Sequence, residues 1–480
     1  MSRFFIKVFV PGPFFEPLTY SSDKPIEAGL RVKAPLGSRE IVGISAGEAS
    51  ESQDLSTIKS ILEVLDDAPV IDPSHHALIR FASDYYLAPA GDLLLSSLPT
   101  AIRKGKPFPL AKTEQGQSQP PQYPLTDEQQ HAIDCVNQAS GDFQCFLLQG
   151  VTGSGKTQVF SELIRKTLER GKQVLLLVPE IGLTGQMVTR IQQQLTGTLA
   201  VSHSGLADGA RAKAFVAASQ GTADVLIGTR SALFTPIPNL GLILVDEEHD
   251  GAYKNQEGCR YSARDLAIVR AQQMRIPVVL SSATPSLESW HQAEFGKYIR
   301  LRLSSRPGQQ PSPTIRLIDA RHDKPKDGLS EASRRAIRDA IDRDQQALVF
   351  LNRRGYSPVL ICADCGWIPG CRHCDAKPTL HRHPNVLWCH HCDHRQQSIT
   401  VCPECSGLNL LAVGLGTERL EEALATAFPD TPVIRVDRDT TARRRAFKQL
   451  IQPVIDGDPC ILVGTQILAK GHDFKNLSTV

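Results

Sequence analysis

The sequence lacks a strong charge bias and a long apolar run, and we expect no leader segment. Its formal net charge is only +2 over 480 residues, so any nucleic-acid binding must come from local sites. No stretch approaches the roughly 18 apolar residues of a membrane-spanning helix. The start, Met1–Lys7, becomes charged too soon for a signal peptide. We therefore expect a cytoplasmic protein with no membrane partner.

The segment Gln149–Thr157 fits the phosphate-loop pattern G-x-x-x-x-G-K-[ST]. The apolar run before it predicts a strand, and the spacing after it predicts a helix. Backbone N–H groups of such a turn point at a polyphosphate, Lys156 reaches the β- and γ-phosphates, and the Thr157 hydroxyl binds Mg²⁺. The alternative is a glycine-rich turn that matches the pattern by chance and binds no phosphate. The remaining predicted nucleotide-binding residues of the loop are Gly150, Thr152, Gly153, Ser154 and Gly155.

A second stretch supports the first. The apolar run Leu240–Val245 predicts a strand buried on both faces, and it ends in Asp246, Glu247, Glu248 and His249. We expect Asp246 to hold Mg²⁺ through water and Glu247 to orient and deprotonate the attacking water. A solvated acidic turn is the alternative. Together the two stretches predict Mg²⁺-dependent hydrolysis of a nucleoside triphosphate.

Strand and helix patterns predict an α/β fold in several domains. We expect a mainly-β domain over 1–100 with helices at 74–87 and 92–98, then a linker over 101–124. Strand–helix alternation predicts two lobes with parallel sheets, lobe 1 over 125–306 and lobe 2 over 307–480. The expected strands of lobe 1 are Cys145–Leu148, Val174–Val178, Asp224–Gly228, Leu240–Val245 and Pro277–Ser281, and those of lobe 2 begin near Ala347, Val433 and Cys460.

Small hydroxyl residues and glycines follow several of these strands. Such groups suit the phosphates of a single nucleic-acid strand without reading its sequence, and Thr229 and Arg230 are the residues we expect to contact it. Any one of these segments alone is as well explained as a helix cap. The segments are Pro179–Thr184, His203–Gly205, Gly228–Ala232 and Ser281–Pro285.

Eight of the twelve cysteines form four C-x-x-C pairs within the predicted insertion 361–406 of lobe 2. Two such pairs complete a tetrahedral Zn²⁺ shell, so eight thiolates predict two zinc ions. Spacing favours a nested pairing, 371/374 with 389/392 and 362/365 with 402/405, and sequential pairing is the alternative. A redox role is less consistent with four consecutive pairs. The predicted ligands are Cys362, Cys365, Cys371, Cys374, Cys389, Cys392, Cys402 and Cys405.

Seven segments, in chain order, resemble the motifs of superfamily 2 helicases: GVTGSGKT, PEIGLT, GTRSALF, DEEHD, SATPS, FLNRRGY and VGTQILAKGHDF. With the cysteine window between the last two, the chain is similar to the PriA family of bacterial replication-restart helicases (primosomal protein N′). The resemblance covers residues 124–480 and, more loosely, 1–100. It implies two tandem RecA-like lobes and an N-terminal 3′-end-binding DNA-binding domain.

The resemblance also implies function. It implies a 3′ to 5′ DNA helicase that uses ATP, recognises stalled or abandoned forks and initiates primosome assembly. Gln129 would sense adenine, and Gly471 would join the nucleotide site. The implied partners are forked and single-stranded DNA, other primosome proteins, single-strand-binding protein and the replicative helicase.

Further DNA contacts follow from the same resemblance. The segment after DEEHD corresponds to an aromatic-rich loop, in which Tyr253 and Tyr261 would stack on bases beside Arg260. In the N-terminal domain Gly37 keeps its place in the pocket for a DNA 3′ end, while Thr19 stands where relatives have an Asp. This substitution weakens the case for capture of a 3′ end.

Two larger departures from the family give rise to an alternative. The short linker 101–124 stands where relatives carry a winged-helix domain, and the last helicase motif, with its arginine, lies beyond Val480. Without that arginine we expect slow hydrolysis. The alternative reading is thus a zinc-dependent DNA-binding scaffold with weak ATPase activity, and a third is an RNA helicase or duplex translocase.

Overall fold

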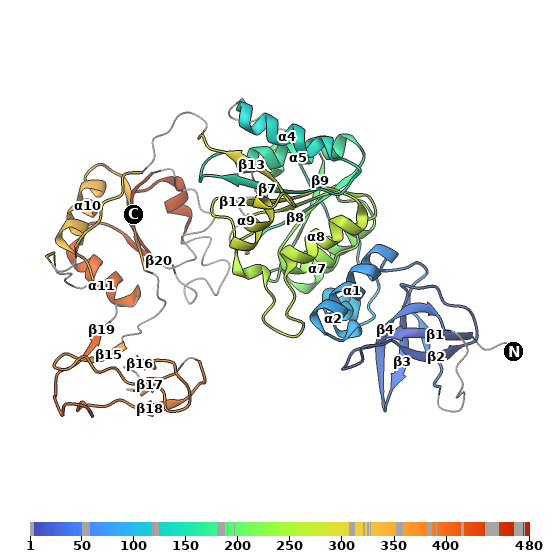
Figure 1. Ribbon diagram of the computed structural model, residues 1–480, viewed down its shortest axis with the longest axis horizontal. Helices are drawn as coiled ribbons and strands as arrows, with labels where there is room; N and C mark the ends of the chain where they lie inside the picture. The colour runs from blue at the N-terminus through green and yellow to red at the C-terminus, as the bar shows by residue number, and fades with distance from the viewer. Residues whose placement is uncertain are drawn as a thin grey trace. The chain divides into compact units, whose positions relative to one another are not determined.

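The chain divides into two compact units, residues 1–312 and 313–480 (Figure 1). The computed structural model describes residues 4–49, 58–117, 119, 124–179, 188–189, 191–195, 197–306, 313–319, 322–323, 326, 328–351, 359–381, 386–389, 391–413, 417–436, 451–464, 474 and 476–480.

The first unit begins with an antiparallel five-stranded sheet in the order β2-β1-β4-β3-β5. The first strand has the alternating pattern of a sheet with one buried face. Ile6 and Val8 are fully buried, while Lys7 between them is exposed. The predicted mainly-β segment is confirmed. The strands are β1 (Phe4–Phe9), β2 (Leu18–Ser22), β3 (Arg31–Leu36), β4 (Arg39–Glu48) and β5 (Glu63–Val64).

Three helices follow this sheet: α1 (Pro73–Tyr86), α2 (Ala90–Ser97) and α3 (Thr100–Arg103). The carboxylate of Asp72 caps α1 by accepting from the backbone N–H of His75 over 2.8 Å. The two helices expected from the sequence are confirmed to within two residues. Helix α1 packs against α8 (Ala263–Met274), so the N-terminal domain and lobe 1 share a contact within one unit.

Lobe 1 contains an eight-stranded sheet in the order β13-β7-β12-β11-β8-β10-β9-β6. All its pairings are parallel except β6 with β9, as a doubly wound sheet requires. The five expected strands are all present. The strands are β6 (Glu114–Gln115), β7 (Cys145–Gly150), β8 (Gln173–Leu177), β9 (Thr198–Ser202), β10 (Val225–Gly228), β11 (Leu240–Val245), β12 (Val278–Ser282) and β13 (Ile299–Leu303).

Helices cover both faces of this sheet (Figure 1). Apolar residues of α4 and α5 pack on one face, and those of α7 and α8 pack on the other. Strand β6 corrects the expectation of a plain linker over 101–124, because Glu114 and Gln115 pair with β9 and extend the sheet. The helices are α4 (Asp127–Gln138), α5 (Lys156–Glu169), α7 (Asp208–Ser219), α8, α9 (Leu287–Glu294) and the 3₁₀ helices η1 (Arg230–Phe234) and η2 (Gly251–Tyr253).

The second unit has a parallel four-stranded sheet in the order β20-β21-β14-β22. Smaller sheets, β15-β19 and β16-β17-β18, carry the cysteine window as an insertion after β14. The elements are α10 (Glu331–Ile341), β14 (Gln346–Phe350), β15 (Val359–Cys362), β16 (Thr379–His381), β17 (Val386–Trp388), β18 (Arg395–Gln397), β19 (Leu410–Val413), α11 (Thr417–Ala427), β20 (Val433–Val436), β21 (Ile461–Gly464) and β22 (Leu477–Thr479).

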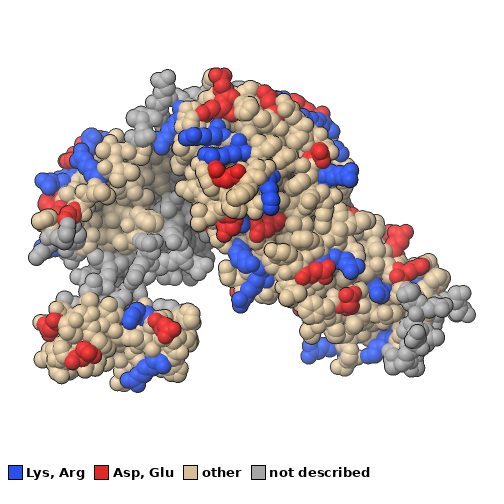
Figure 2. All heavy atoms as spheres, in the orientation of Figure 1, with Lys and Arg blue, Asp and Glu red and all other residues tan. Residues whose placement is uncertain are grey.

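The surface carries charges of both signs, and the described helices differ from a membrane span in length or apolar character. Figure 2 shows Lys and Arg side chains intermingled with Asp and Glu over the drawn face of each unit, as the net charge of +2 suggests. In the part of the chain that the structure describes, no helix has the length and apolar character needed to cross a bilayer.

Candidate functional site

The phosphate loop joins β7 to α5 and its glycines are required by its backbone. Gly153 and Gly155 both have φ of 81°, a left-handed conformation that strains residues with a side chain. A Cβ atom on Gly150 would lie 2.4 Å from Oγ of Ser154. The loop therefore has little freedom in sequence, as expected of a turn that wraps around phosphates.

Lys156 is the first residue of α5, and its ammonium group folds back over the loop. Its Nζ donates to the backbone oxygen of Gly150 over 2.9 Å. Thr152 and Gly153 are exposed, and Thr157 is half-buried one position after Lys156. A phosphate arriving here would meet the N-terminal N–H groups of α5 and could draw the ammonium away from Gly150. The residues present therefore fit a nucleotide.

Gln129 lies against the same loop. Its side chain is fully buried; its Nε2 donates to the backbone oxygen of Ser154 over 2.9 Å, and its Oε1 accepts from the N–H of Thr126. Thr126 in turn caps α4, so the two residues form a capping box. The structure thus brings Gln129 to the phosphate loop, with its amide oxygen and an amide N–H already engaged within the protein. Its contact with adenine stays a prediction.

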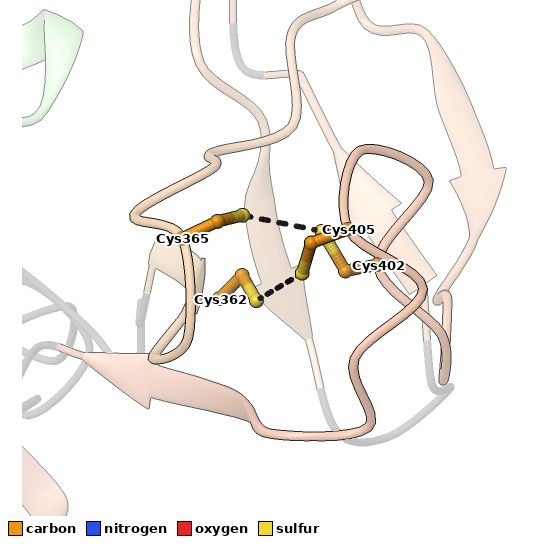
Figure 3. A group of neighbouring side chains, drawn as sticks. All are labelled: Cys362, Cys365, Cys402 and Cys405. Atoms are coloured by element: carbon orange, nitrogen blue, oxygen red, sulfur yellow. Dashed lines mark hydrogen bonds between the residues drawn. The ribbon is translucent and has the colours of Figure 1, made fainter.

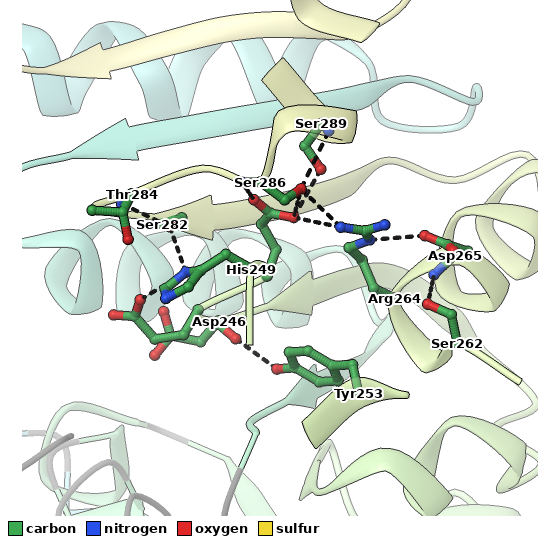
Figure 4. A network of polar contacts seen from close by, with 12 residues as sticks. Asp246, His249, Tyr253, Ser262, Arg264, Asp265, Ser282, Thr284, Ser286 and Ser289 are labelled. Carbon is green, nitrogen blue, oxygen red and sulfur yellow. Dashed lines mark hydrogen bonds and ion pairs between the residues drawn. The ribbon is translucent and has the colours of Figure 1, made fainter. Parts of the chain in front are cut away.

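The predicted acidic residues follow the carboxyl end of β11, where Figure 4 shows Asp246 and His249. Asp246 is buried and its Oδ1 accepts from the hydroxyl of Ser281, at the end of β12, over 3.1 Å. Burial and the neighbouring Glu247 raise the pKa of Asp246 to about 6, while the charge of Lys156 opposes this rise. β12 pairs in parallel with both β7 and β11, so the sheet brings the ends of the strands that precede the phosphate loop and Asp246 to the same edge.

Glu247 has a strained backbone, with φ of 45°, and its carboxylate is partly exposed. Its Oε2 lies 3.5 Å from Nδ1 of His249. The same nitrogen of His249 is 2.8 Å from the hydroxyl oxygen of Ser282, which also accepts from the N–H of Thr284. His249 therefore connects the acidic segment with the Ser281–Pro285 segment at the end of the neighbouring strand (Figure 4).

The structure assigns Glu248 a role that the sequence reasoning missed. Its carboxylate is fully buried and accepts from the N–H of Ser286 at 2.7 Å, the hydroxyl of Ser289 at 2.8 Å and the guanidinium of Arg264 at 3.2 Å (Figure 4). These bonds hold the start of α9 and the start of α8 together. The sequence did not predict this role for Glu248. The apolar strand that precedes the acidic segment does not determine whether Glu247 or Glu248 points into the protein.

Two residues expected to stack on bases are instead buried. Tyr253 is 2% exposed and Tyr261 is 7% exposed. The ring of Tyr261 packs edge-on against Phe234, with centroids 5.0 Å apart. The prediction of base stacking by these two tyrosines is wrong for this structure, because neither ring has a face open to a ligand.

The other predicted DNA contacts are at the surface or near it. Arg230 begins η1 directly after Thr229, and its Nη1 donates to the backbone oxygen of Lys254 over 3.0 Å. Arg260 is exposed. Gly37 turns the chain between β3 and β4 with φ of 63°, and its oxygen accepts from Nζ of Lys59. Their contacts with DNA stay predictions.

Some predicted residues lie outside the described part of the chain. These are Gly471, most of the segment Pro179–Thr184, and most of the FLNRRGY and VGTQILAKGHDF segments. The described geometry of the nucleotide site therefore comes from lobe 1.

The eight cysteines of the window gather into two groups of four, as the nested pairing predicts. In the first group Cys362 lies 3.5 Å from Cys405 and Cys365 lies 3.7 Å from Cys402, between sulfur atoms (Figure 3).

In the second group the sulfur atoms of Cys371 and Cys392, and those of Cys374 and Cys389, are 3.5 Å apart. A tetrahedral Zn²⁺ site with Zn–S bonds of about 2.3 Å places its sulfur atoms roughly 3.8 Å apart. Both groups fit zinc, and sequential pairing is excluded.

Comparisons with known proteins agree with these sites. Three family models match the chain: the PriA 3′DNA-binding domain (3′BD) over residues 7–99, the DEAD/DEAH box helicase over 126–293, and the PriA DNA helicase Cys-rich region (CRR) domain over 371–397.

The chain is also similar to whole proteins. It is 36% identical to the replication restart protein PriA of Haemophilus influenzae, over 99% of this chain and 75% of that protein. The protein of the same name from Bacillus subtilis is 42% identical over 74% of this chain and 45% of its own length. The one from Rickettsia felis is 33% identical over 99% and 73%. The chain therefore belongs to the family of replication restart protein PriA.

Proposed function

We propose that this chain is an ATP-dependent DNA helicase of replication restart. It moves 3′ to 5′ on single strands, recognises stalled or abandoned forks, and initiates primosome assembly there. The observation that carries the proposal is that β12 pairs in parallel with both β7 and β11, so the phosphate loop after β7 and Asp246 after β11 lie at the same edge of one sheet. A phosphate-binding lysine opposite a buried acid at strand ends is the arrangement that nucleotide hydrolysis needs.

Each residue of the site has a distinct part in hydrolysis. The loop N–H groups and Lys156 hold the β- and γ-phosphates, and Thr157 and Asp246 hold Mg²⁺, which neutralises charge on the phosphates when bound. Glu247, with its partly exposed carboxylate, orients and deprotonates the attacking water. Gln129 positions the loop from α4 through its bond to the backbone oxygen of Ser154, and we assign recognition of the adenine base to it.

His249 gives hydrolysis a route to the DNA-binding segments. Its Nδ1 faces both Glu247 and Ser282, so a change in charge near Glu247 on hydrolysis alters the Ser282 contact. We assign strand contact to Thr229, Arg230 and Arg260, whose backbone positions and cationic groups suit phosphates. The zinc groups supply a rigid insertion that engages DNA, single-strand-binding protein, primosome proteins or the replicative helicase.

Hydrolysis tests the proposal directly. We expect the ATPase rate in Mg²⁺ to rise with forked DNA and to vanish in Lys156→Ala. Lys166→Ala is a matched control, because Lys166 lies on the same helix but pairs with Asp134 at 3.7 Å. A negligible rate in the unmodified chain, with DNA binding retained, would instead favour the scaffold reading.

Two further comparisons test the finer parts of the proposal. Stimulation by RNA equal to that by DNA would support an RNA helicase. Unwinding of duplexes with a 3′ single-stranded tail, and not of those with a 5′ tail, would establish the direction. Loss of hydrolysis when Mg²⁺ is chelated, restored by adding it back, would establish the metal.

A further inference from the structure

Helix α1 presents aromatic rings that the hydrophobic core does not explain. Phe81 and Tyr85 lie one turn apart on its outer face, with centroids 5.6 Å apart and planes inclined by only 12°. Phe81 is 37% exposed and Tyr85 is 69% exposed. Positions i and i+4 of a helix bring two such side chains together, but this spacing does not explain why both rings are exposed to solvent. Two parallel rings with an open face are suited to receive a third planar group.

A third ring, at the end of α1, joins this pair to lobe 1. Tyr85 meets Tyr86 edge-on, with centroids 4.9 Å apart. The ammonium group of Lys254 lies 5.2 Å from the centre of the Tyr86 ring, and the Tyr86 hydroxyl accepts from the N–H of Ser262 over 3.1 Å. Phe81, Tyr85, Tyr86 and Lys254 therefore form one continuous surface, which we name the α1 platform.

At its lobe 1 end, the α1 platform is hydrogen-bonded to Arg230, which we proposed as a contact for single-stranded DNA. The backbone oxygen of Lys254 accepts from the guanidinium of Arg230 at 3.0 Å, and that of Ala252 accepts from the same nitrogen at 3.2 Å. Between them, Tyr253 is anchored to the backbone of Asp246. A strand held at Arg230 thus has the α1 platform beside it.

The charges around the platform favour a polyanion. Arg80 on α1, and Lys254 and Arg260 on the loop, are exposed cations. The exposed acids on the same two segments are Asp84 and Glu257. The charge of Asp265 on α8 also acts on Tyr86, and this acid is paired with Arg264. With Arg230 and Arg264 included, the cations are in excess of the acids. Aromatic faces flanked by cations bind single strands because every base has a face that can stack.

We propose that the α1 platform holds the bases of a single DNA strand that passes from lobe 1 toward the N-terminal domain. Phe81 and Tyr85 offer ring faces, Tyr86 supports Tyr85 from its edge, and Lys254 meets the backbone. This inference rests on the proposed function, since it extends the path of the same strand. It replaces the stacking by Tyr253 and Tyr261, which burial excludes.

Direct binding tests the platform. We expect Tyr85→Ala to weaken the affinity for fluorescently labelled oligothymidylate, measured by anisotropy without ATP, by roughly fivefold or more. Phe81→Ala with Tyr85→Ala should weaken it further, and Tyr85→Phe, which keeps the ring, should bind as the unmodified chain does. Phe295→Ala is the matched control, because Phe295, directly after α9, is a similarly open ring at 71% exposure.

The outcomes separate this inference from the proposed function. Affinity in Tyr85→Ala equal to that of the unmodified chain, or an equal loss in Phe295→Ala or Tyr85→Phe, would overturn the platform. The DNA dependence of ATP hydrolysis gives an independent test. At saturating DNA the platform variants should hydrolyse ATP as fast as the unmodified chain, but they should need a higher DNA concentration to reach half of that rate. A chain with no DNA-stimulated hydrolysis would contradict the proposed function, while the anisotropy measurement would still judge the platform.

Discussion

The hydroxyl of Tyr253 donates to the backbone oxygen of Asp246 over 2.6 Å. It also lies 3.0 Å from the backbone oxygen of Leu177, at the end of β8. Burial raises the pKa of this hydroxyl well above its ordinary value, so it stays a donor. The loop that carries Lys254 is thus pinned to the strand ends that hold the predicted Mg²⁺ ligand. If DNA binding moves this loop, the hydrogen bond between Tyr253 and the backbone of Asp246 transmits the movement to Asp246.

We expect Tyr253→Phe to lower DNA-stimulated hydrolysis while the protein stays folded. The ring still fills its site, but the lost hydroxyl bond costs about 1 kcal/mol of stability and frees the backbone of Asp246. The stimulated rate should fall by up to about tenfold, equivalent to roughly 1.4 kcal/mol, with less change in the rate without DNA. Steady-state ATPase assays with and without DNA measure both.

A matched control separates stability from coupling. Tyr20→Phe removes a hydroxyl that donates to the backbone oxygen of Pro35 over 3.1 Å, in a ring that is 3% exposed. It should cost similar stability and leave hydrolysis unchanged. Equal losses of stimulated rate in both variants would show that the Tyr253 bond acts only through general stability.

The two neighbouring glutamates should respond differently to the same change. Glu247→Gln removes the predicted base and should lower hydrolysis by about 10²-fold or more, with little effect on the melting temperature. Glu248→Gln weakens buried bonds to Arg264 and Ser286, so it should lower stability by about 2 kcal/mol. ATPase rates and thermal unfolding, measured on both variants, give the comparison.

An exposed acid provides the reference for this pair. Glu257→Gln alters a carboxylate in the loop that is open to solvent and should leave both quantities near their original values. If Glu248→Gln lost hydrolysis fully at unchanged stability, the roles of the two carboxylates would have to be exchanged.

The sequence predicted those parts of the fold in which one physical cause dominates. Strands such as β11 read as unbroken apolar runs because both faces are buried. Strand β13, Ile299–Leu303, was missed because it lies at the sheet edge and alternates arginines with apolar residues. Strand β9, Thr198–Ser202, was missed because its two ends are polar.

The site was predictable where spacing fixes geometry. The glycines of the phosphate loop and the nested cysteine pairs follow from local turns, and the structure places both as expected. The directions of Tyr253 and Glu248 depend on contacts with β8 and α9, which are distant in sequence. No local pattern encodes those contacts, so the tyrosine was predicted outside and the glutamate was left without a role.

Acid should weaken the first unit through His75. Burial, and next the charge of Arg270, lower the pKa of His75 from 6.5 to about 3. Between these values the unfolded chain binds more protons than the native one, so stability is full above pH 6.5 and falls as pH drops toward 3. The limiting slope is about 1.4 kcal/mol per pH unit. Thermal midpoints measured on both sides of neutrality, down to mildly acidic buffer, should show it.

The contribution of His75 is isolated by comparing variants. In His75→Phe the acid-induced fall of the midpoint should be smaller than in the unmodified chain, because the titrating group is gone. His131→Phe changes an exposed histidine on α4 and should leave the fall as it was. The same fall in all three proteins would mean that other groups carry the pH dependence.

Zinc content should follow the nested groups. The unmodified chain should bind two zinc ions, and Cys371→Ser should bind one. Cys371→Ser with Cys392→Ser removes two ligands of one group and should still retain one ion. Cys362→Ser with Cys374→Ser takes one ligand from each group and should lose both, whereas sequential pairing predicts the reverse for these two doubles. Metal analysis of purified protein measures this.

The activity of Cys371→Ser then decides what the insertion does. The predicted catalytic residues lie in the first unit and the cysteines lie in the second, so loss of one zinc should reduce unwinding more than basal hydrolysis. Structural zinc contributes about 10 to 16 kcal/mol of apparent binding free energy, enough to unfold a small module when it is lost. Cys135→Ser, in α4, should keep both ions and both activities. Equal loss of unwinding and hydrolysis in Cys371→Ser would show that the insertion only supports its lobe.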